Sequence, residues 1–304
     1  MTGRVSAVRR RRLGLLDAII AAAAIAVVVY VVYRINTYLV YNWDWERLIQ
    51  FFVRFDATRG QWVPNLLFEG IVISIRVCFW GAVMALAIGL VMGLCRVSNA
   101  LVLRQISRGY VELVRNMAPV PFFFIAFFFV GNQLLLPLEL DSMMREASPE
   151  TRAVVDVLFG QPNLLRNFIA AAIALALYDG AYITEIVRAG VQSIERGQWE
   201  AANSLGLSRY HVLRHVVLPQ AVQRITPPLT NQSIQLVKDS ALVSLLSIQE
   251  LTFMGQEIAH STTRFFETWI IVAALYFVAC YGLSRLYGRI ERRMKRGRTE
   301  IVGA

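Results

Sequence analysis

The chain has 304 residues, of which 56% are hydrophobic and only 17% are charged, and its mean hydropathy is +0.50. A soluble domain carries charge on about a quarter of its residues, so these values indicate a membrane protein. The net charge of +10 comes almost entirely from arginine, and the arginines gather at the ends of apolar runs. That distribution is typical of membrane proteins and argues against a nucleic-acid partner.

The first twelve residues hold five arginines and precede an apolar run from Leu13 to Tyr33. The length of this run predicts a retained membrane-spanning helix rather than a cleaved signal peptide. A polar loop with several tryptophans follows at residues 35–65. In the second predicted span, Val77 to Cys95, small residues recur every four positions, which lets another helix approach closely. They are Gly81, Ala85, Gly89 and Gly93.

Four more spans are predicted from apolar runs, at Met117 to Leu138, Asn167 to Thr184, Ile225 to Ile248 and Thr268 to Ser284. The connections assigned to the inside, 1–12, 96–115, 188–224 and 285–298, hold five, four, five and seven Lys or Arg residues. Those assigned to the outside, 35–65 and 139–163, hold three and two. Positive residues favour the cytoplasmic side. The sequence therefore predicts an all-α, polytopic helical bundle of about six transmembrane helices with both termini in the cytoplasm.

The polar segment between the fourth and fifth spans, residues 198–220, reads QWEAANSLGLSRYHVLRHVVLPQ and is here called the EAA hairpin. Gly206 suits the left-handed residue that ends a helix, and Ser208 can cap a second helix that Pro219 interrupts. The pattern alone is equally consistent with an amphipathic loop that packs under the bundle. We expect a short helical hairpin on the inner membrane surface.

The spacing within the hairpin is specific: Glu-Ala-Ala, three residues, Gly, nine residues, an aliphatic residue, one residue, then Leu-Pro. It is met by Glu200, Ala201, Ala202, Gly206, Val216, Leu218 and Pro219. This spacing resembles the EAA loop of permease subunits of ATP-binding-cassette (ABC) importers. The stretch YDGAYITEIVRAGVQSIERGQWEAANSLGL, which starts at Tyr178 and includes Gly197, resembles the polar amino-acid uptake branch, to which histidine, glutamine and general amino-acid permeases belong.

Two further segments carry the same resemblance, QLVKDSALVSLLSIQEL from Gln235 and YVELVRNMAPVPFFF from Tyr110, although the second departs from the usual pattern at residues 116–118. The resemblance covers about residues 66–296. It implies a type I ABC importer transmembrane domain over 66–296, after an added basic segment, helix and external loop at 1–65 and before a cytoplasmic tail at 297–304. It also implies a location in the bacterial inner membrane.

The resemblance further implies the partners. They are two ABC ATPase subunits, a second permease subunit that is identical or different, a substrate-binding protein, membrane lipid and a polar amino acid. The EAA hairpin would be the coupling helix, acting through Gly197, Glu200, Ala201, Ala202, Gly206, Leu218 and Pro219. Glu200 would either face the positive end of its helix or pair with an arginine of the ATPase. The partner would use ATP and Mg²⁺, because this chain lacks the GxxxxGK[ST] phosphate loop and is expected to bind no cofactor itself.

Charged and polar side chains inside spans are costly in lipid and are candidates for a substrate pathway. They are Arg76, Asp179, Tyr182, Glu185, Asn231, Gln235, Lys238 and Asp239. A zwitterionic amino acid needs a cation and an anion, which these positions would supply in one dry pocket. The alternative is that Lys238 and Asp239, or Glu185 and Arg188, only neutralise structural neighbours. Glu185 lies one helical turn before Arg188, a spacing that suits a structural ion pair.

No catalytic constellation is recognisable, so a transport subunit is favoured over a membrane enzyme. His211 and His215 have the spacing of two metal ligands but lack a third nearby, and Cys78, Cys95 and Cys280 lie in apolar runs, so no metal site is expected. Two alternatives to polar amino-acid import stay open. One is the same importer class acting on opines or other amino-acid derivatives, and the other is a channel or carrier that works without ATP.

Overall fold

The computed structural model describes residues 15–38, 41, 43–57 and 60–302 and divides into two compact units, residues 1–44 and 45–304. The first unit contains one helix, α1 (Leu15–Tyr38), whose segment from Leu16 to Arg34 is long and apolar enough to cross a membrane. The predicted basic segment at 1–12 lies outside the described residues. The apolar run expected here thus forms a single continuous helix.

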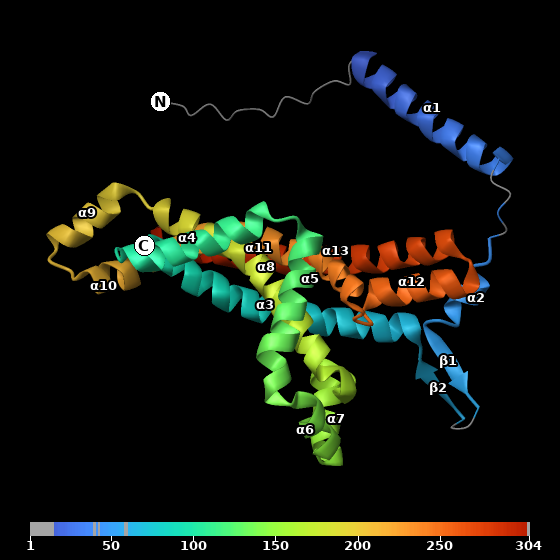
Figure 1. Cartoon of the computed structure of the whole chain (residues 1–304). Helices are drawn as coiled ribbons and strands as arrows, with labels where there is room; N and C mark the ends of the chain where they lie inside the picture. The colour runs from blue at the N-terminus through green and yellow to red at the C-terminus, as the bar shows by residue number, and fades with distance from the viewer. Residues whose placement is uncertain (1–14, 39–40, 42, 58–59, 303–304) are drawn as a thin grey trace. The chain divides into compact units, whose positions relative to one another are not determined.

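The second unit is a bundle of helices with a small β-hairpin at one end and α9 and α10 at the other (Figure 1). Its first elements are α2 (Glu46–Ile49), β1 (Val53–Asp56), β2 (Gln61–Pro64), α3 (Leu66–Val97), α4 (Leu101–Asn116), α5 (Pro119–Phe129), α6 (Leu140–Glu146) and α7 (Pro149–Phe159). They are followed by α8 (Leu165–Gln192), α9 (Arg196–Ser204), α10 (Arg209–His211), α11 (Leu218–Asp239), α12 (Leu251–Thr262) and α13 (Phe265–Val302). The predicted all-α bundle is confirmed.

Within the described residues, β-strands occur only in the predicted polar loop, where β1 and β2 pair antiparallel from Val53 opposite Pro64 to Asp56 opposite Gln61. Leu48, just before this hairpin, is fully buried in a cluster with Leu67, Leu251, Ile258 and Val272. Leu48 therefore attaches α2 to the bundle. The proposed division of the chain at residues 65 and 66 stays a prediction.

Five helices in the described part of the chain are long and apolar enough to span a membrane. Four of them, Leu66–Val97, Pro119–Leu138, Pro162–Gln192 and Phe265–Arg289, lie in the second unit. The predicted span at 225–248 falls on α11, a 22-residue helix that contains Pro227 and Pro228 and is too polar to be among the five. α11 packs against α3, α8 and α13, so part of this polar helix is covered by protein.

The small-residue stripe of α3 packs against α8, the most extensive helix pair of the unit. All four stripe residues are buried. A Cβ atom added to Gly81 would lie 2.8 Å from Leu175 Cδ2, and one added to Gly93 would lie 2.6 Å from Val187 Cβ. The predicted close approach is therefore confirmed, and α8 is the partner.

We predict that Gly93→Leu destabilises the chain strongly, because the added side chain has to enter the space that Val187 fills. Overpacking of this kind costs about 1–3 kcal/mol or more. The measurement is thermal unfolding of the detergent-solubilised protein. Gly282→Leu on α13 is the matched control, since a Cβ atom at Gly282 meets nothing within 4 Å. Equal unfolding midpoints for the two variants would contradict this packing.

The start of α12 is held by Glu250, whose side chain is 1% exposed. Its Oε2 accepts hydrogen bonds from Ser74 Oγ at 3.1 Å and Tyr276 Oη at 2.6 Å, and its Oε1 accepts from the Phe253 N–H at 2.9 Å. One carboxylate thereby caps α12 and ties it to α3 and α13. An acidic residue directly before a helical pattern is a sequence signal for such a cap, and Glu250 was not among the residues predicted to be functional.

Candidate functional site: the EAA hairpin and two polar cavities

The turn of the EAA hairpin is built on Gly206. Its φ of +72° lies in the left-handed region, its N–H donates to the Asn203 carbonyl at 2.9 Å, and the Leu205 N–H donates to the Ala201 carbonyl at 3.2 Å. These bonds close the carboxyl end of α9. The predicted role of Gly206 as the residue that ends the helix is confirmed.

The second arm of the hairpin begins directly after Ser208, whose carbonyl accepts from the Val212 N–H at 2.9 Å. The predicted interruption at Pro219 is wrong, since α10 leads through a π-helical stretch, Val212–Val217, into α11 without a break. The Leu218 N–H donates to the Leu213 carbonyl, five residues back. This widened turn lies directly before Pro219, whose ring and missing N–H would disturb regular α-helical bonding.

One face of the hairpin is buried and the other is exposed. Ala202 is 3% exposed and Val217 is fully buried, and Gln220 Nε2 donates to Gln198 Oε1 at 3.1 Å to join the two arms. The exposed positions of the predicted coupling set are Gly197, Glu200, Ala201, Gly206 and Pro219. Ala202 and the half-buried Leu218 fasten the hairpin to the bundle instead.

Glu200 is the fifth residue of α9, and the first turn of this helix contains no acidic residue. The predicted interaction with the positive helix end is therefore not supported, because that effect fades within the first turn. The carboxylate is exposed, and no ion pair or side-chain hydrogen bond engages it among the residues that the structure describes. It is available to a partner on the outer face of the hairpin.

A cavity of about 540 Å³, here called the Tyr182 cavity, opens where α4, α8 and α11 meet. The Arg115 guanidinium carbon lies 5.4 Å from the centroid of the Tyr182 ring, and Tyr182 Oη lies 3.3 Å from Tyr178 Oη. Arg224 on α11 also lines the cavity and donates to the Ser193 carbonyl. This cavity combines cationic and aromatic groups from three helices.

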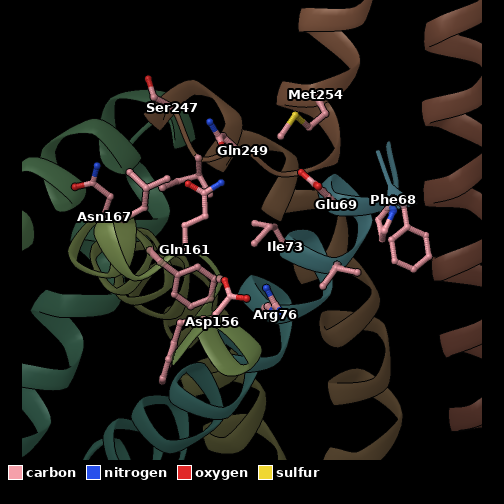
Figure 2. Close-up of a pocket in the computed structure, with 17 residues that line it drawn as sticks. Phe68, Glu69, Ile73, Arg76, Asp156, Gln161, Asn167, Ser247, Gln249 and Met254 are labelled. Atoms are coloured by element: carbon pink, nitrogen blue, oxygen red, sulfur yellow. The ribbon is translucent and has the colours of Figure 1, made fainter. Parts of the chain in front are cut away.

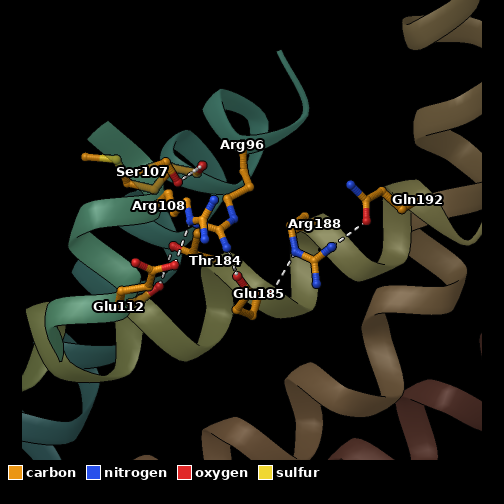
Figure 3. Close-up of polar contacts among 10 residues, drawn as sticks. Arg96, Ser107, Arg108, Glu112, Thr184, Glu185, Arg188 and Gln192 are labelled. Carbon is orange, nitrogen blue, oxygen red and sulfur yellow. Dashed lines mark hydrogen bonds and ion pairs between the residues drawn. The ribbon is translucent and has the colours of Figure 1, made fainter. Parts of the chain in front are cut away.

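Glu185 lines the same cavity and is held by two arginines (Figure 3). Its Oε2 lies 2.7 Å from Arg188 Nε, and its Oε1 lies 3.0 Å from Arg96 Nη2 on α3. The pair with Arg188 follows the predicted alternative, and Arg96 adds a bond between helices. Glu185 is thus a structural link as well as a cavity residue.

Asp179 is fully buried between α8 and α11. Its Oδ1 accepts from Gln232 Nε2 at 2.7 Å, whereas its Oδ2 is buried without a hydrogen-bond partner in the described part of the chain. Gln232 also lines the Tyr182 cavity, so it connects that cavity to the buried carboxylate. A buried acid that is only half satisfied is costly, which marks it as a functional candidate.

Arg76 lies elsewhere, in a separate cavity of about 370 Å³ near the β-hairpin end, here called the Arg76 cavity (Figure 2). Its wall comes from α3, α7, the start of α8 and the segment before α12. Groups of both charges line it. The polar residues are Glu69, Arg76, Asp156, Gln161, Asn167, Ser247 and Gln249.

The predicted pathway residues are therefore not gathered in one pocket. Asn231, Gln235 and Lys238 are exposed on α11, and Gln235 Nε2 donates to Asp239 Oδ1 at 2.9 Å. Arg115 and Arg224 line the Tyr182 cavity without having been predicted to do so. Their sequence signal is a basic residue in or beside the polar segments at the ends of the predicted spans.

Comparison with known proteins agrees with this geometry. Residues 85–296 match the family model of binding-protein-dependent transport system inner membrane components. Glutamine transport system permease proteins of Escherichia coli K12 and Shigella flexneri are each 32% identical over 233 residues, covering 76% of this chain and 93% of theirs.

Two solved structures share the fold. A crystal structure of an amino acid ABC transporter with histidines has a TM-score of 0.62 and 28% identity, and the match covers 83% of this chain and 100% of that one. The MetNI methionine ABC transporter in an inward-facing form has a TM-score of 0.56 and 22% identity, covering 75% and 95%. The resemblance found in the sequence is confirmed: this chain belongs to the binding-protein-dependent transport system inner membrane components, the permeases of ABC importers.

Proposed function

We propose that this chain is the membrane-spanning subunit of an ATP-driven importer of polar amino acids in a bacterial inner membrane. It works with two ATPase subunits, a second permease subunit and a substrate-binding protein, and both of its termini lie in the cytoplasm. The observation that carries the proposal is the EAA hairpin, which buries Ala202 against the bundle and leaves Glu200 exposed without a partner. A surface of that form suits docking to another subunit.

The connections of the hairpin support a role in coupling. Only residues 193–195 separate α9 from α8, and the second arm runs without a break into α11. Arg224 on α11 also bonds to the Ser193 carbonyl, directly before the hairpin. A displacement of α9 by the ATPase therefore acts on α8 and α11, two of the three helices that enclose the Tyr182 cavity. Such rigid displacement of packed helices is an established form of switching.

The two polar cavities support a pathway for a zwitterion. The Arg76 cavity offers a guanidinium for a carboxylate, and Glu69 and Asp156 for an ammonium group, near the β-hairpin end. The Tyr182 cavity offers Arg115 and Tyr182 nearer the EAA hairpin. An amino acid that carries both charges can be bound in either place. The remaining pathway candidates lie on α11, which also lines the Tyr182 cavity: Asn231, Gln235, Lys238 and Asp239.

Two substitutions at Asp179 separate the effect of its negative charge from the effect of its packing. Asp179→Asn keeps the size of the side chain and a hydrogen bond to Gln232, but removes the negative charge. If the carboxylate serves transport, we expect uptake to fall about tenfold or more while assembly and unfolding temperature stay near wild type, since a charge-assisted bond is worth about 1.5–3 kcal/mol. Asp179→Leu, which removes both features, should also lower stability. Normal uptake by Asp179→Asn would assign the residue to packing alone.

The substrate class is tested by competition. Cells that express this chain with its ATPase and binding protein should take up labelled glutamine or another polar amino acid, and unlabelled polar amino acids should compete. Competition by an opine alone would assign the chain to amino-acid derivatives instead. Competition by neither class would reject the substrate part of the proposal and leave the coupling role to be judged separately.

A further inference from the structure

A third cavity, of about 800 Å³, lies between the α3–α4 connection, the end of α8 and the EAA hairpin. We call it the Arg104 cavity. Among the described residues, its charged lining side chains are Arg96, Arg104 and Arg196, and none of those that line it is acidic. The remaining wall is polar or apolar and includes Ser98, Trp199 and Tyr210. Three guanidinium groups thus face one space without a counter-charge in its lining.

The partners of these arginines leave positive charge unbalanced. Arg96 Nη2 lies 3.0 Å from Glu185 Oε1, a carboxylate that Arg188 shares, and Arg96 Nη1 is buried with no hydrogen-bond partner among the residues described. Arg104 and Arg196 are exposed, and no ion pair engages either of them among the described residues. Like charges that share a cavity repel one another, and an anion with several oxygens relieves the repulsion. The chemistry of the cavity therefore favours a phosphate group.

Exposed apolar side chains precede Arg104 in the first turn of α4. Leu101 is 58% exposed, Val102 is 68% exposed, and Leu103 is 43% exposed, all within three residues of Arg104. Leu94, which lines the cavity from the end of α3, is 38% exposed. Apolar side chains beside arginines and aromatic rings are typical of protein at a membrane surface. A ligand with both an anionic head and apolar chains fits this arrangement better than a free ion.

We infer that the Arg104 cavity binds the headgroup of an anionic phospholipid, with the phosphate between Arg104 and Arg196 and the acyl chains along Leu101 and Leu94. The lipid joins the α3–α4 connection to α9 and α10, because Arg104 is on α4 and Arg196 is on α9. The movement of the EAA hairpin then depends on the lipid that occupies the cavity. This inference concerns a site outside both polar cavities and does not require a particular transport substrate.

The test is lipid retention by the full chain, purified in a neutral detergent and probed with phosphatidylglycerol by native mass spectrometry. We expect Arg104→Gln/Arg196→Gln to reduce retention about tenfold or more, since each arginine near an anionic surface contributes appreciably. Arg54→Gln/Arg152→Gln removes two arginines far from the cavity and should stay within about twofold of wild type. Arg104→Lys/Arg196→Lys keeps the charge and should restore most of the retention.

Two outcomes would overturn the inference. The first is equal phosphatidylglycerol retention by the wild-type and Arg104→Gln/Arg196→Gln chains, with circular dichroism showing both folded. The second is displacement of the lipid from wild type by millimolar inorganic phosphate, which would identify a soluble anion as the occupant. Preference for phosphatidylglycerol over phosphatidylcholine that disappears only in the Gln variant would support the lipid site. A Gln variant that fails to fold is replaced by each single substitution, which is subject to the same criteria.

Discussion

Replacing Gly206 by valine is expected to abolish most ATP-driven uptake while leaving membrane insertion and ATP hydrolysis in place. Gly206 adopts a φ of +72°, and a Cβ atom there would meet nothing within 4 Å. The cost therefore comes from the backbone alone, about 1–2 kcal/mol or more for a β-branched residue. Valine would reopen the turn between α9 and α10 and shift Glu200 relative to α11. The measurement is uptake and ATP hydrolysis in proteoliposomes that contain the ATPase.

The matched control for this prediction is Gly206→Asn, because asparagine tolerates the left-handed conformation better than other residues with a Cβ atom. It should retain most of the uptake. If Gly206→Val and Gly206→Asn both transport like wild type, the geometry of the hairpin turn has no part in coupling. If both variants lose uptake equally, coupling requires the absence of a side chain at residue 206 rather than a particular backbone conformation there.

The second large effect is expected from Glu200→Lys. The carboxylate is exposed on α9 without a partner among the described residues, so reversing its charge should not disturb the fold. If it pairs with an arginine of the ATPase, the substitution removes one attractive contact and adds a repulsive one. Loss of a buried charge pair at an interface costs about 2–5 kcal/mol, which predicts binding weaker by about thirtyfold or more. Association of the purified subunits in detergent measures this directly.

Glu195→Lys is the matched charge reversal. Glu195 is exposed next to α9, five residues before Glu200, and lies outside the Glu-Ala-Ala spacing. It should weaken association by less than about threefold, because exposed charges at a rim contribute little. Equal weakening by the two variants would mean that general surface charge, rather than Glu200 itself, holds the ATPase.

Local signals made much of the fold and of the EAA hairpin predictable. The four-residue repeat of small side chains on α3 required a close neighbour whichever helix provided it, and α8 is that helix. Gly206 ends α9 because the turn itself needs a residue with positive φ, which glycine adopts without strain. The spacing from Glu200 to Pro219 identified the family for the same reason, since all of its residues lie within one short segment.

Features that depend on contacts between distant segments were not predictable. Pro219 appeared to end a helix, but the π-helical stretch before it allows the chain to continue into α11. The pathway residues were expected to share a pocket because all are polar residues in spans, yet Arg76 faces the β-hairpin end and Tyr182 faces α11. Their separation follows from where α3 crosses α8, which a hydropathy pattern does not specify.

Glu250 shows the same limit. Its partners Ser74 and Tyr276 are 176 and 26 residues away in the chain, so the reason for burying an acid at this point appears only in the folded bundle. Glu185 was predictable in part, because Arg188 lies one turn away, while its second partner, Arg96, comes from α3. Interactions within one helix are readable from sequence, whereas those between helices are not.

We propose that ATP hydrolysis drives this permease through the EAA hairpin. The most direct measurement is uptake of a labelled polar amino acid by proteoliposomes that contain this chain, its ATPase and its binding protein. Uptake is predicted to require both ATP and the ATPase, and to be lost when Gly206→Val replaces the wild-type chain although ATP is still hydrolysed. Uptake that continues without ATP or without the ATPase would contradict the claim and identify a channel or carrier.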